Sequence, residues 1–247
     1  MLPGLDDGPR DLEGTLALLH AAAAGGTKVI AATPHLRADH PNVRVEALAD
    51  AHAQLLAQLD SDLKLEVVLA GEVDLEWAME ATDDQLRLAS YGQRGSDMLV
   101  ETPYGPLPAG FEEMLFRIRT CGYRILLAHP ERSPSFHSDP QRLVDLVEGG
   151  VLVQLTASSL LQRRRSASSR LVRLLAREGH VHVLASDAHG AGGGRGPDLT
   201  AAVDAARRLA PGRAEWMVGA APAAILAGKA LPPAPVRPPG RRLLRRR

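Results

Sequence analysis

The stretch Phe111-Glu-Glu-Met-Leu-Phe-Arg-Ile-Arg-Thr-Cys-Gly-Tyr-Arg-Ile-Leu-Leu-Ala-His129 predicts one helix followed by one strand. Residues 111–121 form the predicted helix, and Gly122 supplies the residue type that most often ends one. Residues 124–128 are a short apolar run, which is typical of a strand buried on both faces. The run is followed at once by His129, so the stretch predicts a buried strand with a titratable side chain at its carboxyl end.

The same alternation extends along the chain on both sides of this stretch. Further helices are predicted at residues 12–24, 43–59, 141–148, 168–178 and 199–209. Further strands are predicted at residues 28–33, 65–70, 97–101, 151–155 and 181–185. Strands that alternate with helices indicate a parallel sheet covered by helices. About six or seven such units in 247 residues favour a single α/β domain built as a barrel over an open sheet.

Composition excludes several classes of protein. The formal net charge is zero, which gives no reason to expect a nucleic-acid partner. Cys121 is the single cysteine, so no disulfide can form within the chain, and this fits the cytoplasm. It does not begin the Cys-x5-Arg loop of the cysteine-dependent tyrosine phosphatases. No apolar run reaches the ~18 residues that a transmembrane helix needs.

The last residues differ in composition from the rest. Residues 231–240 are rich in proline, and residues 241–247 are dominated by arginine. Such a segment buries little apolar surface, so we predict a domain at residues 1–230 and a flexible tail at 231–247. Contact of the basic end with an anionic membrane surface or an acidic partner is the alternative to a solvated tail.

Five predicted strands are each followed by a histidine or a carboxylate. The positions are His35, Glu72, Glu101, His129 and the pair Asp187 and His189. Taken singly, most of them are equally well explained as surface residues. Because the carboxyl ends of parallel strands meet on one face of a barrel, together they predict one site. Of the remaining histidines, His40 is among those assigned to helices or loops, and His182 flanks a strand and is expected to pack or to face solvent.

Mixed histidine and carboxylate ligands suit divalent metals such as Mn, Fe or Zn. Several carboxylates among imidazoles are typical of multinuclear hydrolases, in which metal ions hold a phosphoryl group and lower the pKa of a bridging water. Arg132 and Arg195 follow His129 and His189 in loops at the same predicted face. Guanidinium groups bind phosphate oxygens in bidentate fashion, so both arginines are predicted to contact a phosphate.

The ordered motifs resemble one family as a set. They are Leu2-Pro-Gly-Leu-Asp-Asp-Gly8, Thr33-Pro-His35, Gly71-Glu-Val73, Val100-Glu101, His129-Pro-Glu-Arg-Ser-Pro134 and Ser186-Asp-Ala-His189. They are similar to those of the PHP (polymerase and histidinol phosphatase) tyrosine phosphatases encoded with bacterial capsule and exopolysaccharide genes, to about Lys229. The resemblance implies a distorted (β/α)7-type barrel with up to three metal ions, usually manganese. It also implies hydrolysis of phosphotyrosine on a protein, typically the tyrosine kinase that controls polysaccharide export.

Carried over by position, the resemblance implies roles for nine residues. One ion would be bound by Asp7, His35 and His189. Glu72 would bridge to a second ion bound by Glu101 and His129, and Asp187 would bind the remaining one. Arg132 and Arg195 would bind the phosphate and stabilise the transition state.

This sequence also departs from the family pattern. Members normally begin with a strand that ends in His-x-His, immediately before the Leu-Pro-Gly motif, whereas this sequence starts at Met1. We therefore expect the first barrel strand and two ligands to be missing and one metal site to be impaired. A start assigned too late and a real truncation are the two explanations. Gln154-Leu-Thr156 also replaces a frequent Gln-x-Asn, and Arg195 is shifted by about one residue.

Two other functions stay open at this point. One is a different PHP phosphoesterase, acting on histidinol phosphate or another small phosphate monoester. The other is a truncated, weakly active module that docks on a kinase or polysaccharide complex. The His129-Pro-Glu-Arg132 motif favours the tyrosine phosphatase, and the ligand set argues against an idle module. The resemblance also allows a homo-oligomer.

Overall fold

The computed structural model describes all residues except 163–164 and 236–247. Its strands are β1 Val29–Ala32, β2 His35–Leu36, β3 Glu66–Leu69, β4 Glu72–Val73, β5 Asp97–Glu101, β6 Arg124–Ala128, β7 Leu152–Thr156 and β8 Val183–Ala185. All pairings between them are parallel. One sheet pairs β1 with β3, and the other has the order β2-β4-β5-β6-β7-β8. The predicted parallel α/β fold is confirmed.

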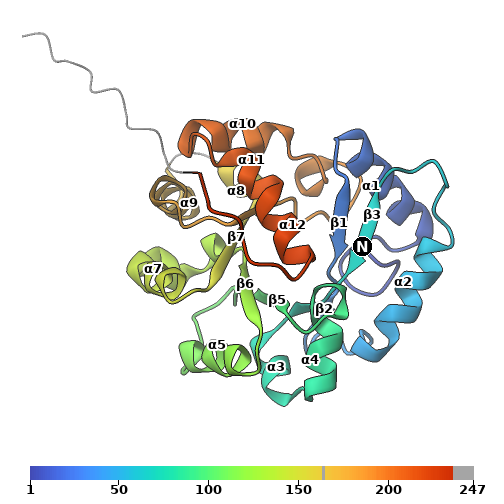
Figure 1. Ribbon diagram of the computed structural model, residues 1–247, viewed down its shortest axis with the longest axis horizontal. Helices are drawn as coiled ribbons and strands as arrows, with labels where there is room; N and C mark the ends of the chain where they lie inside the picture. The colour runs from blue at the N-terminus through green and yellow to red at the C-terminus, as the bar shows by residue number, and fades with distance from the viewer. Residues whose placement is uncertain (163–164, 236–247) are drawn as a thin grey trace, which may run out of the picture.

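The helices cover the outside of this strand arrangement (Figure 1). They are α1 Leu12–Ala24, α2 Leu48–Leu56, α3 Leu75–Glu80, α4 Asp83–Ala89, α5 Phe111–Thr120, α6 Pro134–Ser138, α7 Pro140–Glu148, α8 Ala157–Leu161, α9 Ala167–Glu178, α10 Thr200–Leu209, α11 Ala214–Val218 and α12 Ala220–Leu226. Short 3-10 turns lie at Val45–Ala47, Tyr91–Gln93, Pro130–Arg132 and Gly193–Arg195. None of the helices in the described part is long and apolar enough to cross a membrane.

The two sheets are parts of one interrupted ladder. Only two residues separate β1 from β2, and only two separate β3 from β4. Backbone hydrogen bonds continue across both breaks, from Ala70 to Ala32 and from Glu72 to Pro34. Pro34 has no N–H to contribute, which explains why the ladder is interrupted there. β1 with β2, and β3 with β4, therefore act as two bent strands whose carboxyl ends carry His35 and Glu72.

Most predicted elements match the structure within one or two residues. The helix at 12–24 and the strands at 97–101 and 124–128 have the predicted bounds. The predicted helix at 43–59 is wrong in extent, because residues 45–47 form a 3-10 turn and α2 ends at Leu56. Of the segment predicted as a tail, the structure describes residues 231–235. In this part the Pro232 carbonyl accepts a hydrogen bond from the Trp216 indole. The rest of the predicted tail lies outside the described residues.

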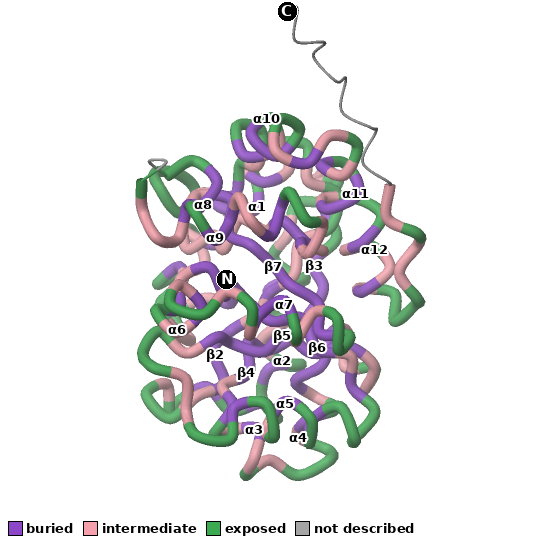
Figure 2. The backbone as a smooth tube through the Cα atoms, turned by 90° about the vertical axis from the view of Figure 1, so that its left-hand side faces the viewer, coloured by how far each residue is buried: buried purple, intermediate pink, exposed green. Residues whose placement is uncertain are grey.

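An open cleft separates β1 from β8. Among the described elements β1 pairs only with β3 and β8 only with β7, so each has one unpaired edge. The cleft has a volume of about 960 Å³ and is lined by apolar strand residues that include Ile30, Leu126 and Val183. Val29 on β1 is 38% exposed, although buried segments run through the middle of the molecule (Figure 2). The ladder is therefore open between β8 and β1.

Helix α5 provides a matched pair of aromatic residues for a stability test. Phe111 is fully buried and meets Phe136 edge to face at 6.0 Å, whereas Phe116 is 59% exposed. We expect Phe111→Ala to lower the free energy of unfolding by about 3–5 kcal/mol, because it removes buried contacts and leaves a cavity. Phe116→Ala should change it by less than about 0.5 kcal/mol. Urea denaturation of both variants measures the difference, and equal values would contradict the packing of α5.

His182 should make the fold sensitive to acid. Burial, with the nearby charge of Arg213, lowers the pKa of His182 to about 4. Its Nδ1 accepts a hydrogen bond from the Val153 N–H at 3.0 Å, which requires an unprotonated nitrogen. Below the unfolded pKa of ~6.5 the unfolded chain binds a proton that the folded chain refuses, so stability falls as the pH drops toward 4. At pH 5 this effect lowers the free energy of unfolding by about 2 kcal/mol relative to neutral pH.

The test compares urea denaturation at pH 7 and pH 5 for the wild type and His182→Gln. The variant should lose less stability between the two pH values than the wild type. His20→Gln is the matched control, because the His20 side chain is half exposed and its pairing with Asp60 lies at the surface. An equal pH dependence of wild type and His182→Gln would show that this buried imidazole does not set the acid limit.

Candidate metal centre

The nine residues predicted for the site are brought together at one end of the ladder. β2, β4 and β5 carry His35, Glu72 and Glu101 on or beside their carboxyl ends. Asp7 lies in the loop before α1, and His129 and Arg132 lie in the loop after β6. The loop after β8 carries Asp187, His189 and Arg195. Side-chain contacts within 4 Å and the carboxylate–imidazole groups described below join all nine into one cluster.

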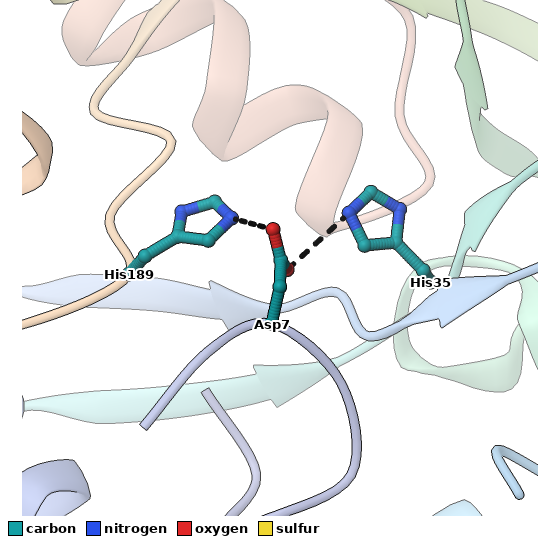
Figure 3. Close-up of side chains that lie close together, drawn as sticks. All are labelled: Asp7, His35 and His189. Atoms are coloured by element: carbon teal, nitrogen blue, oxygen red, sulfur yellow. Dashed lines mark ion pairs between the residues drawn. The ribbon is translucent and has the colours of Figure 1, made fainter. Parts of the chain in front are cut away.

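Asp7 lies between two imidazole rings, as Figure 3 shows. Its two carboxylate oxygens approach His35 Nε2 at 3.5 Å and His189 Nε2 at 3.1 Å. One ligand atom from each residue lies within 4.8 Å of the other two, which leaves room for a single ion. Partial burial alone would raise the pKa of Asp7, but the charges of His189 and His35 bring that pKa below its ordinary value. The three residues therefore fit the ligand set that the family resemblance implies.

A second group is formed by His35, Glu72 and Glu101, all of them buried. Glu72 also contacts His129, whose Nε2 lies 2.8 Å from Glu72 Oε1. Burial and the neighbouring charge of Glu72 raise the pKa of Glu101 above its usual range. Burial alone would lower the pKa of His129, but its hydrogen bond to Glu72 and the charge of that carboxylate bring the pKa above its ordinary value. His35 belongs to both groups, whereas the resemblance assigned it to one ion only.

Two observations indicate that these residues suit bound cations. The Nδ1 atoms of His35 and His129 are buried without a hydrogen-bond partner in the described structure. Buried polar atoms without partners are costly, and imidazole nitrogen is a common ligand of divalent metals. Two buried carboxylates, Glu72 and Glu101, also lie side by side in one group, which favours a positive charge between them.

Arg37 contacts the cluster, although the sequence pattern did not predict it as a site residue. Its Nη1 donates to both carboxylate oxygens of Glu101 at 3.0 Å, and its Nε lies 2.6 Å from Asp39. The only signal was its position two residues after His35. Asp6, next to Asp7, accepts hydrogen bonds from the backbone N–H groups of His35 and Gly8 at 3.1 Å and so shapes the loop before α1.

One of the histidines set aside from the site lies within it. The ring of His40 stacks on that of His35, with centroids 5.4 Å apart and planes 7° from parallel. The prediction that His40 has no part in this region is therefore wrong, because the loop after β2 folds back over the strand end. Of the two possibilities left open for His182, packing and exposure to solvent, the structure shows packing, near Trp216.

Asp187 is approached by both predicted arginines. Its Oδ2 lies 2.6 Å from Arg132 Nη2 and 3.6 Å from Arg195 Nη2. Arg132 also donates to Thr156 Oγ1 at 3.0 Å, and Arg195 Nη2 lies 2.5 Å from His189 Nε2. Two guanidinium groups thus converge beside the histidine–carboxylate cluster, and oxyanions such as phosphate are the ligands that such a pair suits.

Two residues of the cluster adopt a left-handed backbone conformation. The φ angle is 36° at His129 and 52° at Asp187, and Gln93 is the one other non-glycine residue in the described part with positive φ. This conformation is disfavoured for residues with a Cβ and persists where the surroundings enforce it, often at functional sites. Both residues follow the end of a parallel strand, so the turn aims their side chains into the cluster.

Comparison with known proteins agrees with this geometry. The family described as "Capsular polysaccharide synthesis, CpsB/CapC" matches residues 1–226. The chain belongs to the CpsB/CapC family. A relative is the tyrosine-protein phosphatase YwqE of Bacillus subtilis (strain 168), 30% identical over 194 residues, which are 76% of this chain and 74% of YwqE. CapC of Staphylococcus aureus is 26% identical over 196 residues, covering 76% and 74% of the two chains.

A solved CpsB/CapC-type structure has the same fold. It comes from work on YwqE of Bacillus subtilis and CpsB of Streptococcus pneumoniae, described as metal-dependent tyrosine phosphatases. The TM-score is 0.82 at 26% identity, and the match covers 96% of this chain and 97% of that one. The family resemblance drawn from the motifs is confirmed, and the parallel α/β fold of this chain closely matches that of the solved structure.

Proposed function

We propose that this chain is a metal-dependent protein-tyrosine phosphatase. The observation that carries the proposal is the convergence of Arg132 and Arg195 on Asp187, at the edge of a cluster of histidines and carboxylates. This arrangement offers ligands for cations and hydrogen-bond donors for a phosphate on one surface. The match to the CpsB/CapC family and to metal-dependent tyrosine phosphatases supports the same activity.

The metal is proposed to be manganese, with up to three ions. The seven ligands would be Asp7, His35, Glu72, Glu101, His129, Asp187 and His189. Bound divalent ions supply a water of lowered pKa and neutralise charge on a phosphoryl group. Without bound metal, the carboxylates of this chain would repel a phosphate dianion. Metal binding and substrate binding are therefore expected to depend on one another.

The chain's own residues would orient the substrate. Arg132 is only 25% exposed at its side chain, and Asp187 and Thr156 hold one side of its guanidinium, so it binds phosphate oxygens from a fixed position. Arg195 is about half exposed and lies on the short turn Gly193–Arg195, which gives it a freer approach. The leaving group is a phenolate, the anion of a group with pKa ~10, which departs more readily than an alkoxide.

The partner is proposed to be a phosphorylated protein, specifically a bacterial tyrosine kinase that regulates exopolysaccharide synthesis. The CpsB/CapC family description supports this setting. Cys121 is a free thiol, which fits work in the reducing cytoplasm. Self-association is proposed on the family resemblance alone, and sedimentation of the metal-loaded chain tests it.

Substrate preference separates this proposal from its closest alternative. The assay measures phosphate release from a phosphotyrosine peptide and from histidinol phosphate, with Mn²⁺ added. Higher kcat/KM for the peptide is expected. Preference for histidinol phosphate would replace the proposal by a small-molecule phosphoesterase, and a chain that binds no metal near neutral pH would favour a non-catalytic module.

A further inference from the structure

Tyr104 presents an exposed aromatic ring at the rim of the metal centre. The residue is 48% exposed, and its ring stacks on His129 with centroids 5.5 Å apart and planes 17° from parallel. Its hydroxyl oxygen lies 3.3 Å from Arg132 Nη1, which donates to it. Of the large hydrophobic side chains exposed in the described part, it is the one with contacts to a predicted metal ligand and to a phosphate-binding arginine.

The loop that carries Tyr104 is anchored on both sides of it. Thr102 directly follows the last residue of β5, and its hydroxyl donates to the Ala128 carbonyl on β6 at 2.5 Å. The backbone N–H of Leu107 donates to Ser135 Oγ at 3.1 Å. These bonds fix the ends of a short segment, so the ring is held beside Arg132 before any ligand binds. A ring placed in advance binds with a smaller loss of conformational entropy.

We propose that Tyr104 binds the aromatic ring of the substrate and thereby favours aryl phosphates over alkyl phosphates. The inference rests on the proposed tyrosine phosphatase activity and names the residue that recognises the phenyl group. When Arg132 binds the phosphate, an aryl substituent lies one ester oxygen away and so comes beside the Tyr104 ring. Aromatic pairs prefer offset stacked or edge-to-face contacts with centroids ~4.5–7 Å apart, whereas an alkyl phosphate has no ring to offer.

A purely structural role for Tyr104 makes different predictions. If the ring only shields His129 or steadies Arg132, its removal should weaken every phosphate ligand alike. If the ring binds the substituent, only aryl ligands should be affected. The hydroxyl and the ring can also be separated, because Tyr104→Phe removes the contact with Arg132 and retains the stacking surface.

The experiment measures the binding of phenylphosphonate and methylphosphonate to the Mn-loaded chain by calorimetry. Neither ligand has an ester bond to hydrolyse, so the readout does not depend on turnover. The wild type should bind phenylphosphonate more tightly than methylphosphonate. Tyr104→Ala should reduce that preference by roughly 3- to 10-fold, as expected for one aromatic pair. Tyr104→Phe should retain it, and Phe116→Ala, an exposed aromatic outside the centre, is the matched control.

Each outcome decides between the possibilities. An equal loss for both ligands in Tyr104→Ala, or no preference for phenylphosphonate in the wild type, overturns the inference. The proposed function is tested separately by the release of phosphate from a phosphotyrosine peptide. A chain that hydrolyses the peptide without any phenyl preference retains the function and loses the role of Tyr104. A chain that prefers phenylphosphonate but hydrolyses only small alkyl phosphates retains the ring site and loses the function.

Discussion

Replacement of Arg132 by alanine is expected to lower kcat/KM for a phosphotyrosine peptide by roughly 10²- to 10³-fold, the range found when one preorganised donor to a developing negative charge is removed. Arg132 suits that role because Asp187 and Thr156 fix its guanidinium at 2.6 and 3.0 Å. Steady-state kinetics at saturating Mn²⁺ measure the effect. Arg132→Lys should recover only part of the loss, because an ammonium group cannot contact two oxygens in the fixed geometry of a guanidinium.

Arg142→Ala is the matched control for this variant. Arg142 also pairs with a carboxylate, Glu112, but the pair lies on the surface between α5 and α7. Its loss should leave kcat/KM within about two-fold, since exposed ion pairs contribute little to the fold. If Arg132→Ala were as active as Arg142→Ala, phosphate would have to bind elsewhere. Measurement of bound Mn in each variant separates a lost phosphate contact from a lost metal site.

A chain extended at its amino end by a strand that ends in His-x-His should bind Mn²⁺ at least about 100-fold more tightly than residues 1–247 alone. Even changes to groups that only support metal ligands alter affinity by ~10- to 100-fold, and here two ligands are added. The cleft between β1 and β8 has two unpaired edges and an apolar lining that a strand can fill. Met1 also lines this cleft.

The extension should also stabilise the fold, and a second version separates the two effects. Pairing with β1 and β8 would cover Val29 and Ile30, and full burial of one such side chain contributes about 1.5–3 kcal/mol. An otherwise identical extension with Ala-x-Ala should keep this gain in urea denaturation and lose the gain in metal affinity. If neither extension changes stability or bound metal, the cleft is not a site for a strand.

The longer elements and the location of the site could be predicted from the sequence because the signals are local. The strand at 124–128 is an apolar run just after the helix end at Gly122, and the strand at 97–101 is an apolar run between two carboxylates, so both bounds were correct. β2 and β4 span two residues each, which is too short for any periodicity to appear. The predicted ligands on these strands, His35 and Glu72, nonetheless lie in the cluster, because convergence of strand ends depends on topology and not on the length of each strand.

The contacts within the site could not be predicted, because they depend on how loops fold back over the strand ends. Both ring nitrogens of His35 face acidic groups, Asp7 and Glu101, so one residue serves two ligand groups. The position of Arg37 two residues after His35 is the one local signal that sets it apart from other arginines. His40 was set aside because it has no strand-end position, yet its ring stacks on His35.

The left-handed backbone at His129 and Asp187 limits how these two positions can evolve. Each such conformation costs about 1–3 kcal/mol in a residue with a side chain. Glycine would remove that cost and would also remove the imidazole or the carboxylate. A substitution that improves folding at either position therefore removes a proposed metal ligand, so selection for stability and selection for activity would act in opposite directions there. Stabilising changes should accumulate elsewhere in the fold, while these two positions keep their energetic cost.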